Sequence, residues 1–352
     1  MITLGTAPAT LHDRLWRDPE IDILFEPQAE IRALLRYESA LAQAQAKCGF
    51  VKSEAAKTIG QLCASFSPDL PSLATGIARD GVVIPELIRQ LQLSLPKDIR
   101  SSLHMRSTSQ DAIDTAMVMA LAIAIGKLKA RISETLALLM RLEERFGQIP
   151  QMARTRMQRA LPTRASARIA AWCEPIVRHI ARIDQMMPRL LVVQCGGPVG
   201  AEMEPWLPEL ARLLELGVPT RGWQTARDNL SEFASWLSLV SGSAGKIGID
   251  IAMMAQSEIG EVEFANGGRS SAMAHKSNPV SAEILVAIAR FNANQLGCFH
   301  QALVHEQERS GAAWTLEWMV LPRMLSATGA SLNHLNKLLS DISFKPSITS
   351  GS

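Results

Sequence analysis

Residues 227–263 read RDNLSEFASWLSLVSGSAGKIGIDIAMMAQSEIGEVE, and this stretch decides the fold. Apolar residues recur in it at alternating spacings of three and four positions. Such a heptad seam is typical of a helix that packs lengthwise against other helices in a bundle. The seam consists of Leu230, Phe233, Leu237, Val240, Ala244, Ile247, Ile251 and Met254. Its next two positions are Glu258 and Glu261, where we expect the dry stripe to end.

Three further stretches keep a helical spacing of apolar residues. No proline interrupts residues 108–147, and Thr108 followed by Asp111 has the form of a capping box at the start of this helix. The helical pattern continues over residues 279–309 and from residue 314 past 339, with an expected kink at Pro322.

The first hundred residues contain seven prolines and therefore predict short helices, the clearest over residues 28–47. No strand-like alternation of useful length occurs. We predict an all-α fold in which a small helical N-terminal domain (1–105) precedes a bundle of long helices (106–343). The tail from residue 344 to 352 is expected to be frayed.

Composition narrows the class of protein. Hydrophobic residues make up 47% and charged residues 20% of the chain, as in ordinary soluble globular proteins. A net charge of +2 gives no reason to expect nucleic acid or a membrane as a partner. Five scattered cysteines without a CxxC pair predict reduced thiols and a cytoplasmic location. No nucleotide-binding motif or histidine cluster occurs, so we expect neither a cofactor nor a metal.

Residues 267–279 read GGRSSAMAHKSNP and form a second informative stretch, just ahead of a predicted helix. Glycines let the backbone approach a ligand closely, and the serines offer hydroxyl groups. Lys276 adds a compact positive charge, and Asn278 is expected to cap the helix with Pro279 at its first position. This loop suits an anion on which negative charge develops.

Two other segments carry anion-binding groups. Residues 103–116 read LHMRSTSQDAIDTA, and the hydroxyls of Thr108 and Ser109 stand where a helix start offers free N–H groups. Residues 153–162 read ARTRMQRALP and supply guanidinium, hydroxyl and amide donors. Taken singly, the two segments would be read as a helix cap and a basic turn.

Together and in this order, the three segments resemble the three motif regions of the fumarase/aspartase/argininosuccinate lyase superfamily. The loop is similar to the superfamily pattern GSSxMPxKxNP. The resemblance implies a long-helix bundle that forms homotetramers, with each active site built from three subunits. It also implies β-elimination or its reverse through an aci-carboxylate carbanion, acting on a small anionic substrate.

The resemblance also implies roles for single residues. Ser270, six positions before the lysine, resembles the catalytic base. Lys276 and Asn278 resemble the residues that hold a substrate carboxylate and the enolate-like charge. The other implied substrate-binding residues are His104, Thr108, Ser109, Gln110, Arg154, Thr155, Arg156, Gln158, Arg269, Ser271, Met273 and Glu283.

Further segments are similar to the bacterial 3-carboxy-cis,cis-muconate cycloisomerases, in which a muconate carboxylate adds to a double bond to close a lactone. These segments are residues 15–35, 80–85, 194–197, 223–228 and 306–318. The resemblance therefore implies a cycloisomerase of a substituted muconate.

The chain departs from the family pattern at several positions. Arg156 stands where the lyases carry histidine and the cycloisomerases tryptophan, and Arg269 replaces the glycine before Ser270. Ala274 replaces a proline, and Gln224 stands where a histidine usually follows a tryptophan. We also expect the third, small helical domain of the family to be lacking. A leaving carboxylate, with a pKa of about 4, needs no general acid, so lactone chemistry tolerates the missing histidine.

Three alternatives remain open at this point. A 3-sulfomuconate would also suit the extra arginines, although each arginine could instead pair with an acid of a neighbouring chain. An adenylosuccinate-type lyase is disfavoured by the missing histidine. A non-catalytic helical scaffold is disfavoured because it gains nothing from Ser270, Lys276 and Asn278 together.

Overall fold

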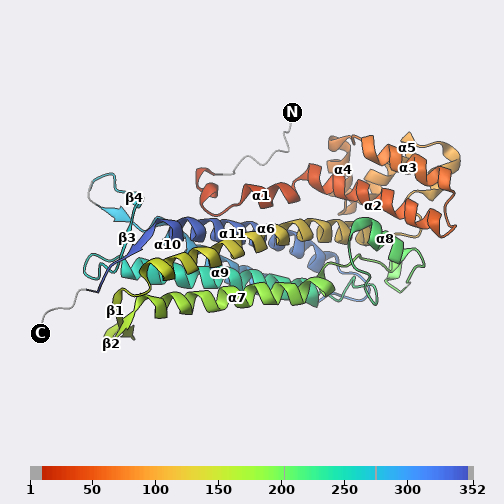
Figure 1. Cartoon of the computed structure of the whole chain (residues 1–352). Helices are drawn as coiled ribbons and strands as arrows, with labels where there is room; N and C mark the ends of the chain where they lie inside the picture. Colours follow the sequence, from red (N-terminus) through yellow and green to blue (C-terminus); the bar gives the residue numbers. More distant parts are fainter. Residues whose placement is uncertain (1–9, 202, 274–275, 348–352) are drawn as a thin grey trace, which may run out of the picture.

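Five long helices lie along one axis and give the molecule an elongated shape (Figure 1). The computed structural model describes residues 10–201, 203–273 and 276–347. Successive long helices run in opposite directions, so their connections lie at two opposite ends of the bundle. The predicted all-α class is confirmed. The helices are α6 (Ser109–Phe146), α7 (Ala165–Leu190), α9 (Asp228–Met254), α10 (Val280–Gln301) and α11 (Gly311–Asp341).

The heptad seam of α9 lies at the centre of the bundle. Each of its eight residues is at most 2% exposed, and α9 packs against α7, α10 and α11. Glycines let α10 approach closely, since a Cβ on Gly248 would lie 2.7 Å from the carbonyl oxygen of Ala282. In the described part of the chain, only α9 is long and apolar enough to cross a membrane, and its buried seam is that of a core helix.

The helical pattern after the seam does not continue as helix. We expected the helix to continue to Glu263, but α9 ends at Met254. The Glu261 N–H donates to the Met254 carbonyl (2.9 Å), after a turn in which Gly260 has a φ of +57°. Strand β3 (Val262–Phe264) follows. Glu261 is fully buried beside the bundle instead of marking an exposed end of the seam.

A β-hairpin joins α6 to α7, where no strand was expected. Strand β1 (Pro150–Thr155) pairs antiparallel with β2 (Gln158–Arg164), with an irregularity between Met152 and Arg154. The bulge and the flanking prolines hide the period-two pattern in the sequence. Arg156 and Met157 form the turn with φ values of +47° and +68°, without a glycine or asparagine to announce it.

The chain end after α11 is ordered further than predicted. Strand β6 (Ile342–Phe344) pairs with β3, and the Phe344 ring lies 6.1 Å from that of Trp172. The Ser347 N–H donates to the Pro150 carbonyl at 3.2 Å. The expectation of a frayed tail is therefore wrong for residues 344–347, whereas residues 348–352 lie outside the described residues.

Most of the shorter helices pack against one end of the bundle (Figure 1), whereas α1 (Pro19–Asp22) packs alongside α11. The helix predicted over residues 28–47 is confirmed as α2, which contacts both α6 and α8. A second apolar core joins these helices to the first turns of α6. The short helices are α1 (Pro19–Asp22), α2 (Pro27–Lys47), α3 (Ser53–Ser65), α4 (Leu70–Asp80), α5 (Ile84–Ser94) and α8 (Leu207–Leu214), with 3-10 turns at Leu11–Leu15, Ile23–Phe25, Lys97–Ser102 and Gly197–Val199.

The ends of α10 differ from the prediction. Its N-cap is Pro279, while Asn278 lies in strand β5 (Ser277–Asn278), which pairs with β4 (Gly268–Arg269). The helix ends at Gln301, eight residues earlier than expected. The following loop, residues 302–310, returns to the start of α6. Pro322 lies inside α11, and a kink there stays a prediction.

Candidate active site

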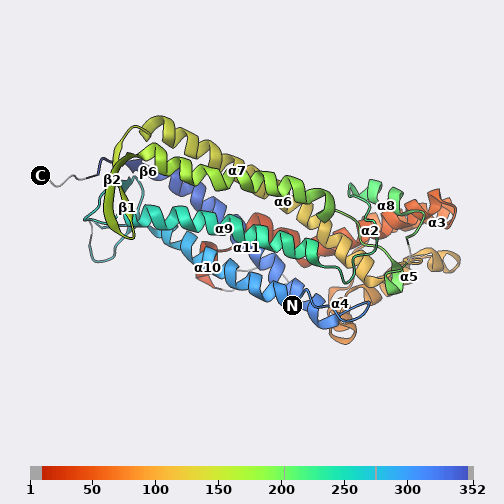
Figure 2. The same ribbon diagram turned by 90° about the horizontal axis from the view of Figure 1, so that it is seen from below.

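The three motif segments lie at opposite ends of the bundle. Residues 103–116 lie at the start of α6, and we call this end of the bundle the Thr108 end. The hairpin and residues 267–279, which we call the serine loop, lie at the opposite end, the Ser270 end (Figures 1 and 2). A helix of 38 residues separates the ends by about 57 Å. Within one copy of the chain, the first segment therefore does not meet the other two.

At the Thr108 end, a cavity of about 310 Å³ opens beside the start of α6. The predicted capping box is confirmed, since the Thr108 N–H donates to the Asp111 carboxylate at 3.1 Å. The structure brings three of the predicted residues together in the cavity wall, namely His104, Thr108 and Ser109. Hydroxyl groups and free N–H groups at a helix N-terminus make this cavity suited to an anion.

We call the part of the cavity wall formed by His104, Thr108 and Ser109 the Thr108 seat. Gln110 lies beneath this seat and does not line it. Its side chain is fully buried and donates to the backbone carbonyl of Gln224 at 2.9 Å. Arg309 reaches over from the loop before α11, donating to Gln110 Oε1 (3.1 Å) and to Thr108 Oγ1 (3.0 Å). Gln110 therefore supports the seat through its neighbours and is not exposed to a ligand in the described chain.

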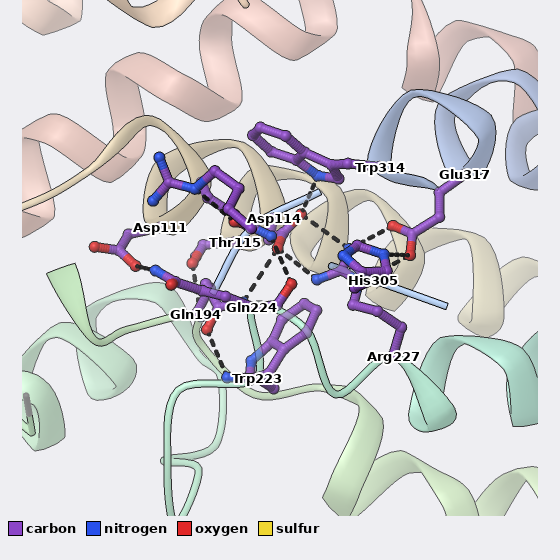
Figure 3. Close-up of polar contacts among 12 residues, drawn as sticks. Asp111, Asp114, Thr115, Gln194, Trp223, Gln224, Arg227, His305, Trp314 and Glu317 are labelled. Atoms are coloured by element: carbon purple, nitrogen blue, oxygen red, sulfur yellow. Dashed lines mark hydrogen bonds and ion pairs between the residues drawn. The ribbon is translucent and has the colours of Figure 1, made fainter. Parts of the chain in front are cut away.

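A buried charge network fixes the first turns of α6 to the bundle (Figure 3). Arg227, 1% exposed, pairs with Asp114 at 2.6 Å and donates from Nε to Glu317 at 2.8 Å. Trp314 Nε1 and Gln194 Nε2 donate to the two oxygens of the Asp114 carboxylate. Burial raises the pKa of the neighbouring Asp111 to about 7. The network joins α6, α9 and α11 at the Thr108 end.

At the Ser270 end, the hairpin presents its predicted residues in two ways. Arg154 is anchored, because it donates to the fully buried Glu261 at 2.7 Å. Thr155, Arg156 and Gln158 are exposed around the hairpin turn, and Arg156 has no ion-pair partner among the described residues. These three side chains point away from the core and can meet a ligand or another chain.

The serine loop is closed at its base by the pairing of β4 with β5. Gly268 lies opposite Asn278, and Arg269 opposite Ser277. Ser270 Oγ accepts hydrogen bonds from the N–H groups of Ala272 (3.3 Å) and Met273 (3.1 Å). Two N–H donors directed at one hydroxyl oxygen stabilise negative charge on it. Ala274, which stands where the family pattern has a proline, lies outside the described residues.

The other predicted residues of this segment lie close along the chain. Ser271, Met273 and Lys276 are exposed in the loop, and Glu283 is exposed in the first turn of α10. Arg269 is exposed on β4. The structure thus groups the predicted hairpin and serine-loop residues at one end and the seat residues at the other.

Sequence reasoning missed three residues as members of the site: Glu38, Glu261 and Arg309. Arg309 bonds Thr108 across 201 positions, and Glu261 bonds Arg154 across 107. Glu38 contacts His104 at 2.6 Å across 66 positions. No local pattern marks such pairs. The one available signal was Glu261 at a seam position, which we interpreted as the end of the dry stripe and not as a buried acid.

A larger cavity of about 640 Å³ lies between α2, α6 and α11. Its wall is mostly apolar, and none of the predicted site residues lines it. In the described part of the chain, no group of three or more histidine, cysteine, aspartate or glutamate side chains is placed to hold a metal ion.

A protein-family model described as Lyase matches residues 24–291. The chain therefore belongs to this family, within the fumarase/aspartase superfamily, and the resemblance seen in the sequence is confirmed.

Particular relatives narrow the comparison. The 3-carboxy-cis,cis-muconate cycloisomerase of Pseudomonas aeruginosa is 33% identical over 96% of this chain and 76% of its own length. The N-acetyl-S-(2-succino)cysteine lyase of Enterococcus italicus is 30% identical over 94% of this chain and 74% of its own length. The crystal structure of the 3-carboxy-cis,cis-muconate lactonizing enzyme from Pseudomonas putida matches with a TM-score of 0.89 at 31% identity, covering 95% of this chain and 77% of that one.

Proposed function

We propose that this chain is a cycloisomerase that interconverts 3-carboxy-cis,cis-muconate and its muconolactone, a step in the degradation of aromatic compounds in the cytoplasm. The observation that carries the proposal is the geometry of Ser270, whose Oγ receives two backbone N–H groups. The similarity to cycloisomerases at 31–33% identity supports the substrate class.

The chemistry asks for one proton transfer and for stabilisation of one developing charge. In lactone formation, a carboxylate oxygen of the substrate bonds to an alkene carbon, and the neighbouring carbon accumulates aci-carboxylate charge. The Ser270 hydroxyl then delivers a proton to that carbon, leaving an alkoxide that the two N–H groups stabilise. In this proposal Lys276 and Asn278 hold the charged carboxylate.

The presence of Arg156, where the lyases carry histidine, fits this reaction better than the elimination of an amine. In the reverse direction, the departing group is a carboxylate with a pKa of about 4, which leaves as an anion without a proton donor. The exposed Arg156 at the hairpin tip offers positive charge to such a group.

The complete site requires more than one copy of the chain. Ser270 and the Thr108 seat lie at opposite ends of α6, too far apart to share one small substrate. We infer a homotetramer in which the serine loop of one copy and the hairpin of another approach the seat of a third. The exposed apolar side chains of the hairpin, Met157 (69%) and Leu161 (73%), suit such a contact.

A second candidate function is a lyase that releases a thiol from an S-succinyl thioether. The 30% identity to an N-acetyl-S-(2-succino)cysteine lyase favours it. The departing thiol has a pKa of about 8.5, so it leaves as a thiolate more readily than an amine leaves without a proton. The missing histidine therefore argues less strongly against this reaction than against the elimination of an amine. An adenylosuccinate-type lyase and a 3-sulfomuconate cycloisomerase remain further substrates to assay.

The test is the ultraviolet absorbance of the substrate. Incubation of the protein with 3-carboxy-cis,cis-muconate should remove the conjugated-diene absorbance, and the Ser270→Ala variant should not. Parallel incubations with N-acetyl-S-(2-succino)cysteine and adenylosuccinate should release no fumarate. An unchanged diene signal at high protein concentration, together with fumarate release from either thioether or nucleotide, would transfer the assignment to that lyase.

Arg156 and Arg269 are expected to recognise an anionic 3-substituent. A charge-assisted hydrogen bond to such a group is typically worth about 1.5–3 kcal/mol. Arg156→Met and Arg269→Met should therefore each lower kcat/KM roughly 10- to 100-fold for 3-carboxymuconate and 3-sulfomuconate. Both variants should change kcat/KM little for unsubstituted cis,cis-muconate. Kinetics with the three substrates make the measurement.

The matched control is Arg164→Met, which changes an exposed arginine of the same hairpin that bonds Gln148. It should leave the order of the three specificity constants unchanged. Equal kcat/KM values for all three substrates in the unmodified protein would show that neither Arg156 nor Arg269 recognises the substituent.

A further inference from the structure

The cavity at the Thr108 end contains a histidine with an unusual environment. His104 lines the cavity together with Ser107, Thr108 and Ser109. Its side chain is 15% exposed, so the ring is mostly enclosed by protein but still reaches the cavity.

The carboxylate of Glu38, on helix α2, hydrogen-bonds one nitrogen of this ring. Glu38 of α2 is fully buried, and its Oε1 lies 2.6 Å from His104 Nδ1. A carboxylate accepts at this distance, so Nδ1–H is the donor, which leaves Nε2 as the nitrogen available to a ligand. A carboxylate that holds one imidazole nitrogen sets the tautomer and raises the basicity of the other.

The charges around the pair favour a cationic ring. Glu38 Oε2 is buried without a hydrogen-bond partner among the described residues, and a buried carboxylate in this state needs a cation beside it. From α6, Asp111 adds a further acid, while Arg89 of α5 also lines the cavity but pairs with Glu86. Burial lowers the pKa of His104, but the charge and hydrogen bond of Glu38, together with the charge of Asp111, outweigh burial and raise this pKa.

The backbone around His104 is held in a conformation that it would not adopt alone. His104 and Arg106 both have a φ of +55°, in the left-handed region that non-glycine residues disfavour. Besides Glu38, two side chains of α2 tether this segment. Tyr37 bonds Ser107 at 2.9 Å, and Gln45 donates to the Met105 carbonyl at 2.6 Å. The fold therefore holds the imidazole against the carboxylate and at the cavity wall.

We infer that Glu38 is a positioning residue that holds His104 as an imidazolium, so that Nε2–H donates into the cavity to a carboxylate of the bound substrate. The inference rests on the proposed function for the nature of that substrate. It assigns part of the site's positive charge to a dyad between α2 and the start of α6.

The test compares Glu38→Gln with Gln45→Met. Glu38 and Gln45 are both buried, and each substitution nearly preserves the size of the side chain. Both substitutions remove a hydrogen bond from α2 to residues 104–107, but only Glu38→Gln removes a charge. The protonation midpoint of His104 is measured by NMR on histidine-labelled protein, with a His104→Asn variant assigning its signal among the seven histidines. Binding of succinate, which has no double bond and cannot react, is measured by calorimetry across the same pH range.

The wild-type midpoint should lie above that of a free histidine. Glu38→Gln should lower the proton affinity of His104 about tenfold or more, whereas Gln45→Met should leave it in place and Glu38→Asp should restore part of it. Since the pair raises the pKa of His104, succinate binding should weaken as the pH rises through that pKa. In Glu38→Gln this loss of binding on raising the pH should begin at a lower pH.

A wild-type midpoint at or below that of free histidine, or equal shifts in Glu38→Gln and Gln45→Met, would overturn the inference. The wild-type titration gives this answer even if a variant does not fold. Because neither measurement uses turnover, a normal dyad in a protein that leaves 3-carboxymuconate unchanged would reject the proposed substrate and keep the role of Glu38.

Discussion

Ser270→Ala should lower kcat for lactone formation by a factor of about 10² to 10⁴, because it removes the group that transfers the proton. KM should change far less, since the hydroxyl already accepts two bonds from its own loop, from Ala272 and Met273. The loss should therefore appear in kcat and in kcat/KM together, as expected for an interaction used in the transition state. Stopped-flow measurement of the diene absorbance gives both constants.

Ser271→Ala is the comparison that makes this result specific. Ser271 is the adjacent, exposed serine of the same loop, and no N–H group of the described residues donates to its hydroxyl. A full rate in Ser270→Ala together with a collapsed rate in Ser271→Ala would move the proton transfer to the neighbouring residue. Equal small effects in both variants would remove the loop hydroxyls from the mechanism.

Arg227→Met should produce the largest loss of stability of any single change considered. The substitution leaves the carboxylates of Asp114 and Glu317, both with no exposed side-chain area, without their shared cation. Removing one partner of a buried ion pair typically costs about 3–5 kcal/mol of the free energy of unfolding. Chemical denaturation followed by circular dichroism measures the change.

The control is Arg189→Met, which breaks an Arg–Glu pair with Glu232 that is nearly half exposed on both sides. Exposed pairs contribute about 0–1 kcal/mol, so this variant should unfold almost like the unmodified protein. Similar losses in Arg227→Met and Arg189→Met would show that the network at the start of α6 is not the anchor that its geometry indicates.

Local patterns predicted the parts of the fold that local physics determines. The seam of α9 was readable because burial on one helix face repeats with the helical period, and the start of α6 because a capping box is a four-residue signal. The β-hairpin could not be predicted, because its turn places Arg156 and Met157 in the left-handed region, which these residue types rarely adopt. The order of Phe344 to Ser347 depends on pairing with β3, which no tail sequence shows.

The candidate site divides in the same way. Ser270, Lys276 and Thr108 stand in short motifs and could be named from the sequence. Ser270 is held by N–H groups of its own loop, but the partners of Thr108 and Arg154 come from distant segments, namely Arg309 and Glu261. The resemblance implied that each active site is built from three subunits. How the copies would meet in the proposed tetramer depends on their surfaces, which a heptad pattern does not encode.

The central claim is that the serine loop of one copy serves the Thr108 seat of another, and mixing two inactive variants tests it directly. Ser270→Ala and His104→Asn change opposite ends of the bundle, and each should be strongly impaired alone. After subunit exchange between equal amounts, about a quarter of the sites should combine an unmodified loop with an unmodified seat and recover diene turnover in that proportion. If native mass spectrometry shows mixed oligomers and no activity returns, the serine loop and the Thr108 seat do not serve a common site and the claim is wrong.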